Sequence, residues 1–428
     1  MSRDHLLRAA NVSLRALTLV SKFALLFLLA KFLEPREVGM FGLLAATIGY
    51  ALYVVGFEFY TYSTRAIIGA NPGERLGLVK NQAAFHVATY VVALPLLLLV
   101  FWLGWLPWRY CVWLMVLLVL EHAAQELNRI LIATSRPLMA STVLFLRSGA
   151  WCWVVGLGIW LQPSWRHIEF VLGAWAASGL LACALALTAL LRFERTSTRR
   201  PVNWRWVAAG LKVAAPLFLA SLSVRGVFTL DRYWIESAGG LEVLGAYVLF
   251  IGMATAVLSF LDAAVVDFAY PHLVAAAKNQ DRVAFGKGME SLRRHVAVTT
   301  IVLIAACWLL SELILNWLQN PVYVRHASVL PWLLLAVAIY AISTIPHLGL
   351  YAHGKDRPIV LSQATAFLVF VACAVTVGPR ADAVTVAKTL CLAFTVVLLW
   401  KGAAYLHFSR GRNLHPHMPD ATRSAPTK

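Results

Sequence analysis

The chain has 428 residues, of which 60% are apolar and 13% are charged, and its mean hydropathy is +0.73. Soluble domains carry about 25% charged residues, so this composition excludes an ordinary water-soluble protein and indicates a lipid environment. The net charge of +17 does not point to nucleic acid, because the basic residues form short clusters between long apolar runs. The six cysteines all lie in apolar segments without a CxxC pair, which indicates packing residues and not a metal site or disulfide framework.

Apolar stretches long enough to cross a bilayer recur along the whole chain. A helix needs about 20 residues for one crossing. In chain order we predict about twelve transmembrane helices, at 10–33, 39–62, 82–106, 109–133, 139–161, 168–191, 208–234, 241–269, 295–318, 328–353, 358–378 and 382–407. The connections are too short to hold a folded soluble domain. We therefore expect an all-α polytopic membrane protein.

The distribution of Lys and Arg predicts the orientation of these spans. With both termini on one side, that side carries 24 basic residues. The opposite loops carry only five, namely Arg36, Arg109, Arg166, Arg325 and Arg380. Because cytoplasmic loops are enriched in Lys and Arg, we expect both termini to be cytoplasmic.

An internal repeat is indicated by two similar turns. Leu33–Phe41 (LEPREVGMF) and Gly240–Tyr247 (GLEVLGAY) each place an acidic turn before a glycine that an aromatic residue follows two positions later. The two glycines, Gly39 and Gly245, lie 206 residues apart, close to half the chain. A glycine there lets a helix begin tightly against its neighbour. Chance similarity of two turns is the alternative.

The repeat predicts two six-helix lobes around a central cavity, with a transport pathway between them. The predicted domains are an N-terminal lobe at 1–191, a cytoplasmic linker at 192–207, a C-terminal lobe at 208–408 and a disordered cytoplasmic tail at 409–428.

Basic residues lie inside the first and seventh predicted spans. Arg15 and Lys22 are seven residues apart in the first, and Arg225 and Arg232 are seven apart in the seventh, so each pair shares a helix face. Facing lipid, the four would together cost on the order of 10 kcal/mol. We therefore predict that they line a cavity and bind an anion, phosphate being the anion that Arg fits best. Structural ion pairs, or a basic side chain reaching the interface from Arg15, are the alternatives.

Other charges lie within the predicted spans. Arg147 is a further anion-binding candidate, although pairing with Glu121 on the neighbouring span is an equally direct reading. Membrane carboxylates are candidates for proton or sodium coupling. The ion-coupling candidates are Glu121, Asp231, Asp262 and Asp267, with local pairing to Arg232 or anchoring at the interface as alternatives. No GxxxxGK[ST] loop and no HExxH motif occur, so we expect no ATPase, no metal site and no cofactor.

Two short motifs resemble a known transporter family. Leu29–Gly42 (LAKFLEPREVGMFG) is similar to the opening of the polysaccharide transporter branch of the multidrug/oligosaccharidyl-lipid/polysaccharide exporter superfamily, which includes the O-antigen flippases. Leu230–Tyr233 (LDRY), followed by Gly239–Tyr247 (GGLEVLGAY), resembles the Asp-Arg pair and Gly-x-Tyr turn of its seventh helix. Lys22 departs from the family's arginine, which weakens bidentate phosphate binding.

The resemblance implies a non-enzymatic flippase that works by alternating access. Its substrate would be an oligosaccharide on undecaprenyl pyrophosphate, moved to the periplasmic leaflet for O-antigen, capsule or exopolysaccharide biosynthesis. The implied partners are this lipid-linked oligosaccharide, the phospholipid bilayer and, in the cell, a polysaccharide polymerase and a chain-length regulator. A drug or metabolite exporter of the same superfamily is the first alternative, and a membrane polysaccharide polymerase or ligase is the second.

Overall fold

The computed structural model describes residues 3–193 and 201–414, and every regular element in these ranges is a helix. The first half contains α1 (Arg3–Phe32), α2 (Pro35–Gly56), α3 (Tyr60–Gly69), α4 (Pro72–Trp102), α5 (Cys111–Ala133), α6 (Pro137–Phe145), α7 (Trp151–Leu161) and α8 (Ile168–Phe193). The second half contains α9 (Trp204–Leu261), α10 (Asp267–Lys278), α11 (Arg282–Leu318), α12 (Pro321–Arg325), α13 (Leu330–Ala352), α14 (Asp356–Val377) and α15 (Ala383–Leu414). Two π-helical turns join neighbours: η2 (Leu146–Ala150) joins α6 to α7, and η4 (Asp262–Val266) joins α9 to α10.

Eleven helical stretches in the described part of the chain are long and apolar enough to cross a membrane. One of them, Trp204–Lys278, has 75 residues, far more than the roughly 20 that one crossing needs. Its backbone leaves helical geometry at Gly240, with φ 76° and ψ 180°, a conformation that glycine adopts readily. Ten single crossings plus the two halves of this stretch give the predicted twelve, and the all-α membrane fold is confirmed.

Several helix ends differ from the predicted limits. The second span ends at Gly56, not at 62, because Phe57 and Glu58 both take left-handed backbone angles and α3 begins afterwards. Helix α15 continues to Leu414, so the first residues of the predicted tail are helical, and residues 415–428 lie outside the described part. Much of the predicted linker, 194–200, lies outside it as well.

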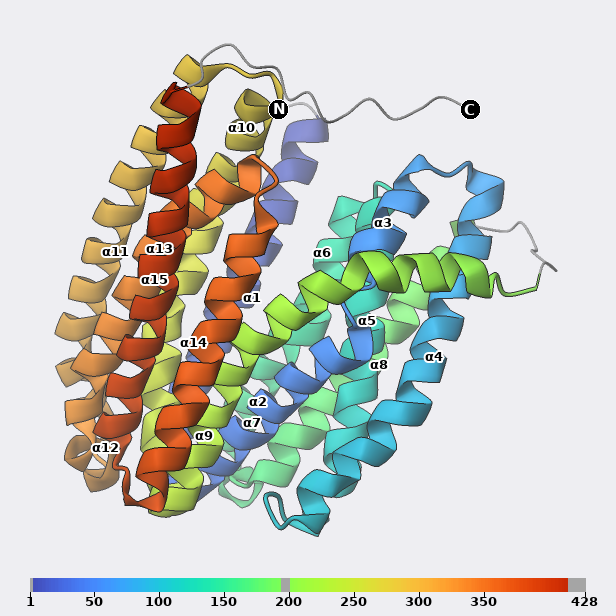
Figure 1. The fold of residues 1–428 in the computed structure, drawn as a ribbon. Coiled ribbons are helices and arrows are strands. Elements are labelled where there is room, and N and C mark those ends of the chain that lie inside the picture. The colour runs from blue at the N-terminus through green and yellow to red at the C-terminus, as the bar shows by residue number, and fades with distance from the viewer. Residues whose placement is uncertain (1–2, 194–200, 415–428) are drawn as a thin grey trace.

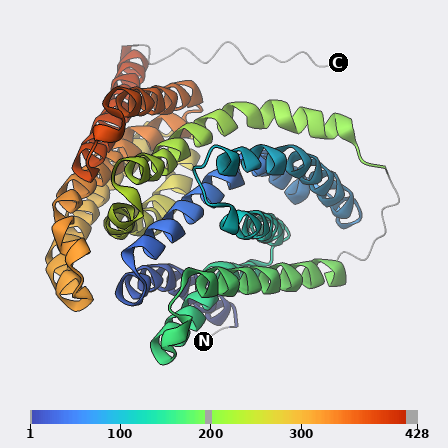
Figure 2. The ribbon, with the colours of Figure 1, turned by 90° about the horizontal axis from the view of Figure 1, so that it is seen from below.

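The helices form two groups that lie side by side. Figure 1 shows α10, α11 and α13–α15 together on one side and α3–α8 on the other, with α1, α2 and α9 between them. The view from below separates the same two groups (Figure 2). The start of α1 and the end of α15 lie at the same end of the molecule (Figure 1), as an even number of crossings requires. We call the opposite end the distal end.

The two lobes meet through α1, α2 and the two halves of α9. Helix α2 runs along the first half of α9, where the Thr47 and Tyr233 hydroxyls hydrogen bond at 2.6 Å and the rings of Phe57 and Phe218 stack at 4.1 Å. Helix α1 runs along the second half, where Phe23 stacks on Phe260. Each lobe therefore contributes one helix pair to the contact, which is the arrangement expected of a repeat.

The repeat glycines lie against each other's helix. A Cβ atom on Gly39 would come within 2.2 Å of the Leu241 carbonyl oxygen, and one on Gly245 within 2.0 Å of the Pro35 carbonyl oxygen. Both contacts are with backbone, which cannot swing aside as a side chain can. The two turns recognised in the sequence thus form one close helix-helix contact between the lobes, at the distal end.

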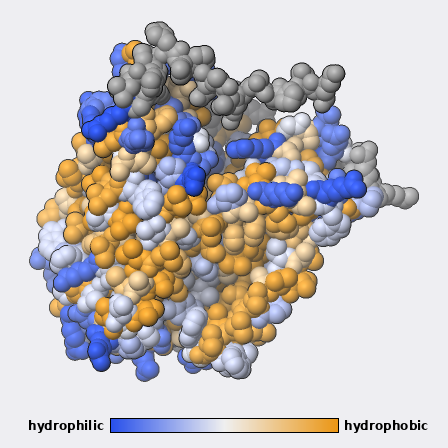
Figure 3. Space-filling model, viewed as in Figure 1, coloured by the Kyte–Doolittle hydropathy of each residue, from blue (hydrophilic) through white to orange (hydrophobic). Residues whose placement is uncertain are grey.

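The outer surface is apolar. Figure 3 shows hydrophobic residues across the middle of both lobes, with hydrophilic residues towards the ends. Large apolar side chains such as Trp102 and Val375 are 76% and 77% exposed. Contiguous apolar surface of this extent is typical of a protein that lipid surrounds.

The first turn of α9 packs on the N-terminal lobe, although residues 204–207 fall within the predicted linker, 192–207. Val207 is buried against Phe59 and Phe85, and the Trp206 ring lies edge-on to Phe59 at 5.5 Å. The Asn203 backbone N–H also donates to Asn81 Oδ1 at 3.0 Å. Figure 1 shows this part of α9 crossing the N-terminal lobe before the helix joins the second group.

Candidate functional site

A buried ion pair joins α5 to the π-helical turn η2. Arg147 Nε lies 3.3 Å from Glu121 Oε2, with 14% and 9% of the two side chains exposed. The other carboxylate oxygen accepts a 2.7 Å hydrogen bond from Trp175 Nε1 on α8. The Trp175 ring stacks on Trp151 at 5.5 Å and 8°. Glu121 is thus held on both oxygens, as the pairing alternative anticipated, and Arg147 is not a free cation.

Lys22 extends this group from α1. Its side chain is exposed and lies near enough to Arg147 and Glu121 for their charges to interact. Two cations then face one carboxylate, which leaves the group with one net positive charge. The adjacent turn η2 places Arg147 in a π bulge, a feature that is frequent at functional sites.

Arg15, also on α1, is exposed and lies beside α6. Its Nε donates to Ser141 Oγ at 3.4 Å, and the Ser141 hydroxyl donates in turn to Asn11 Oδ1. Among the contacts of the described residues, Arg15 has one hydrogen bond, to a neutral hydroxyl, and no ion pair with a carboxylate, so its charge stays uncompensated.

Arg225 on α9 lies at the contact between the lobes. Its Nε donates to the Tyr53 hydroxyl at 3.0 Å, and the guanidinium lies over the Tyr53 ring at 5.1 Å from its centre. The charges of Arg225 and Asp262 interact, as do those of Asp262 and Asp267. All three charged side chains are exposed. The C-terminal lobe therefore presents one cation and two carboxylates, a different balance from that near Lys22.

Arg232 and Asp231 pair with each other. Asp231 is fully buried, accepting hydrogen bonds from the Tyr247 hydroxyl at 2.7 Å and from the Arg232 backbone N–H at 2.8 Å. Arg232 lies 3.1 Å from Asp231 and also donates to the Phe228 carbonyl. Although Arg225 and Arg232 share a helix face by spacing, the structure gives them different surroundings, and only Arg225 is exposed. This group ties the two halves of α9 together.

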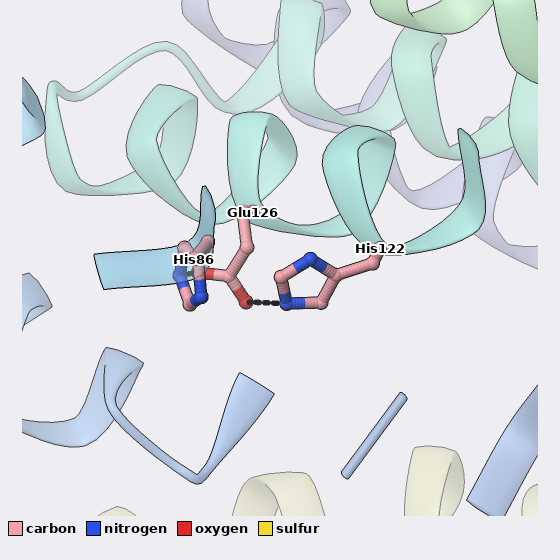
Figure 4. Close-up of side chains that lie close together, drawn as sticks. All are labelled: His86, His122 and Glu126. Atoms are coloured by element: carbon pink, nitrogen blue, oxygen red, sulfur yellow. Dashed lines mark ion pairs between the residues drawn. The ribbon is translucent and has the colours of Figure 1, made fainter. Parts of the chain in front are cut away.

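A cluster that the sequence reasoning missed lies between α4 and α5. His86, His122 and Glu126 are buried, and their ligand atoms all lie within 4.8 Å of one another. Figure 4 shows the His86 ring facing Glu126 and His122 from the neighbouring helix. One signal was available, because His122 and Glu126 are four residues apart, as are Gln82 and His86. The sequence alone does not rotate those two faces toward each other.

Lys401 on α15 was also missed, and it is 2% exposed. Its ammonium group lies near the His347 side chain on α13. A separate cavity of about 350 Å³ lies at the distal end of the second lobe, lined in part by Arg325, His326 and Asp382. Burial, and then the neighbouring Arg325, lower the pKa of His326.

The sequence matches no protein-family model and no curated protein, whereas the fold matches solved structures. A multidrug resistance transporter of the MATE family, of the MOP superfamily, in an inward-facing conformation is similar with a TM-score of 0.70 and 12% identity, over 94% of this chain and 99% of that one. The lipid II flippase MurJ in an inward closed conformation is similar with a TM-score of 0.68 and 12% identity, over 97% and 94%. A further MATE structure gives 0.56 and 15%, over 95% of both chains.

These likenesses show the fold. The chain has the two-lobed helical architecture that MATE transporters and the MurJ flippase share, over nearly its whole length. One of these neighbours is named for multidrug resistance and the other for a lipid.

Proposed function

We propose that this protein is a flippase that moves an oligosaccharide linked to undecaprenyl pyrophosphate from the cytoplasmic to the periplasmic leaflet of a bacterial inner membrane. The observation that carries the proposal is the set of exposed cations, Arg15, Lys22 and Arg225, on the helices through which the lobes meet. A pyrophosphate carries several negative charges, and Arg and Lys are the side chains that bind it.

The substrate would use the two lobes in sequence. The headgroup binds between α1 and α9, where Lys22 and Arg147 outnumber Glu121, while the polyprenyl tail stays in lipid. The lobes then rock about their contact, opening the distal end that Gly39 and Gly245 hold closed in this structure. Both termini are cytoplasmic in this scheme, because the basic loops lie on their side. A polymerase and a chain-length regulator would act on the flipped product.

An ion gradient, without any bound cofactor, would supply the driving force. Among the predicted coupling carboxylates, Asp262 and Asp267 are exposed and lie close together, so a proton or sodium ion can reach them. Glu121 and Asp231 are each held by an arginine and a second donor, which favours a structural role. We therefore place ion coupling on the exposed pair.

The test is ATP-independent flipping in proteoliposomes. A pyrophosphate-linked oligosaccharide on a short polyprenol is placed in the vesicles, and access of an external glycosidase reports its translocation. We expect protein-dependent flipping that falls at least tenfold in Arg225→Gln and stays unchanged in the control Arg294→Gln, an exposed arginine near the start of α11. Equal flipping by wild type and Arg225→Gln would remove Arg225 from the anion site.

A drug or metabolite exporter is the second candidate, and one observation favours it. Asp262 and Asp267 outnumber Arg225 in their group, and exposed carboxylates suit a cationic substrate. Efflux of cationic dyes that Asp262→Asn abolishes, in a protein that flips no lipid-linked sugar, would transfer the assignment to this class. Lengthening of the glycan by the purified protein would instead indicate a polymerase or ligase.

A further inference from the structure

The cluster between α4 and α5 collects the donor atoms of a metal site. Helix α4 supplies Gln82 and His86, and helix α5 supplies His122 and Glu126. The four residues are between 2% and 6% exposed, so the position is closed to bulk solvent. His86 Nε2 lies 3.6 Å from Glu126 Oε2, and His122 Nε2 lies 4.0 Å from Glu126 Oε1.

Several of these atoms have no hydrogen-bond partner within the described part of the chain. They are both ring nitrogens of His86, Nε2 of His122 and Oε1 of Gln82. Buried polar atoms are almost always paired, and each unpaired one costs about 1–3 kcal/mol. One ring nitrogen of His86 and Nε2 of His122, both beside the Glu126 carboxylate, therefore point to a ligand that the two rings share, since an imidazole presents only one nitrogen to a single ion.

The spacing fits a small tetrahedral ion. Zinc–nitrogen and zinc–oxygen bonds of about 2.0–2.1 Å place neighbouring ligand atoms roughly 3.4 Å apart. The 3.6 Å between His86 Nε2 and Glu126 Oε2 is close to this value, and the widest separation in the set, within 4.8 Å, needs a small inward turn of the rings. The Gln82 amide, which donates to Glu126 Oε2 at 2.6 Å, presents its oxygen instead when the amide is turned over.

The surrounding residues supply the supports that metal ligands have. The Tyr90 hydroxyl lies 2.7 Å from His122 Nδ1, so a proton on Nδ1 donated to Tyr90 leaves Nε2 free for a metal. Arg129 pairs with Glu126 Oε1 and lies over the Tyr60 ring, which leaves Oε2 on the side of His86. Ligating histidines and carboxylates are held in this way by groups behind them.

We propose that His86, His122, Glu126 and Gln82 bind one divalent transition-metal ion, Zn²⁺ foremost, which joins α4 to α5. Two imidazoles favour zinc or a related metal over sodium, magnesium or calcium, which prefer oxygen ligands. Four protein ligands in a closed position are typical of structural sites, so the ion stabilises the N-terminal lobe and takes no part in a reaction. The proposal is independent of the substrate.

The first experiment measures metal content. The protein is purified through an affinity tag that contains no histidine, stripped with chelator, reloaded with Zn²⁺ or Co²⁺ and desalted. We expect about one ion per chain by mass spectrometry, visible d–d absorption from the cobalt form, and a melting temperature that falls when chelator is added. In His86→Gln and His122→Gln the ion is lost, whereas the control His347→Gln, on α13, keeps it.

Two further variants separate loss of the ion from loss of the fold. His122→Cys keeps a ligand, so its cobalt form should gain a thiolate charge-transfer band. Tyr90→Phe removes only a support and should weaken metal affinity roughly 10- to 100-fold. Wild-type protein that holds less than a fifth of an ion per chain after reloading, or histidine variants that hold as much as wild type, would overturn the proposal.

Discussion

The close contact between Gly39 and Gly245 predicts how a single methyl group would change the balance between the lobes. In Gly245→Ala the new Cβ would lie 2.0 Å from the Pro35 carbonyl oxygen, whereas ordinary contact begins at 3.4 Å. The difference, 3.4 − 2.0, is 1.4 Å, and because the obstructing atom is backbone the helices themselves must separate. Overpacking of this kind costs about 1–3 kcal/mol.

This overpacking destabilises only the conformation in which the distal end is closed. A difference of about 1–3 kcal/mol changes the ratio of two conformations roughly 5- to 150-fold. We therefore expect Gly245→Ala to raise the distal-open population by that factor and to slow transport, because a cycle needs both states. The matched control is Gly49→Ala on α2, where a Cβ meets nothing within 4 Å.

The assay is pulsed electron paramagnetic resonance between spin labels at Gln162 and Arg325, which lie in different lobes and are exposed. The six native cysteines are replaced first. Wild type and Gly49→Ala should give mainly a short distance, and Gly245→Ala a longer one. A distribution in Gly245→Ala that matches both others, with normal thermal stability, would refute the reasoning.

Three other substitutions test the buried polar groups by thermal unfolding in detergent. Glu121→Gln should destabilise the protein by about 3 kcal/mol, because it leaves Arg147 without its carboxylate partner. This value is the lower end of the range for a broken buried ion pair, since the Arg147 side chain is 14% exposed. The double variant with Arg147→Met should recover most of the lost stability, and additive losses would argue against the pair. Tyr247→Phe should cost about 1.5–3 kcal/mol by removing a hydrogen bond to buried Asp231, and a neutral result would contradict that bond. Asp382 caps the N-terminus of α15 by accepting hydrogen bonds from the Thr385 hydroxyl and backbone N–H, which lower the pKa of its carboxyl. The stability that this cap adds is therefore present at neutral pH and is lost as the pH falls through the lowered pKa. Asp382→Ala should cost about 1 kcal/mol at pH 7 and nothing in acid; an equal loss at both pH values would refute the cap.

The sequence predicted those features that depend on composition and local pattern. Twelve crossings follow from apolar length, and the paired glycines follow from one repeated turn. Gly56 marks the end of the second span, but the left-handed backbone angles fall on Phe57 and Glu58, residues that rarely adopt them, so the reversal itself was not predictable. The π turns at Arg147 and Asp262 likewise leave no local signal.

Side-chain surroundings were predicted less well than helix faces. The seven-residue spacing placed Arg225 and Arg232 on one helix face. In the structure Arg232 instead forms an ion pair with Asp231, its neighbour in the chain. Glu121 and Arg147 were recognised as a pair because their helices are adjacent in sequence and their depths agree. His86 and His122 come together only because of how α4 and α5 are rotated about their axes, and this rotation cannot be predicted from a single sequence.

The first turns of α9 have a mechanical consequence. That helix is fixed at Val207 to the aromatic cluster of the N-terminal lobe and, from Gly226 onward, to Phe367 in the C-terminal lobe. Its two ends are therefore packed on different lobes, which must tilt relative to each other during transport. Pro216 lies between these two contacts and lacks the N–H for the helical hydrogen bond, so the helix should bend most easily at this residue. The bend angle of α9 at Pro216 should then change with the angle between the two lobes.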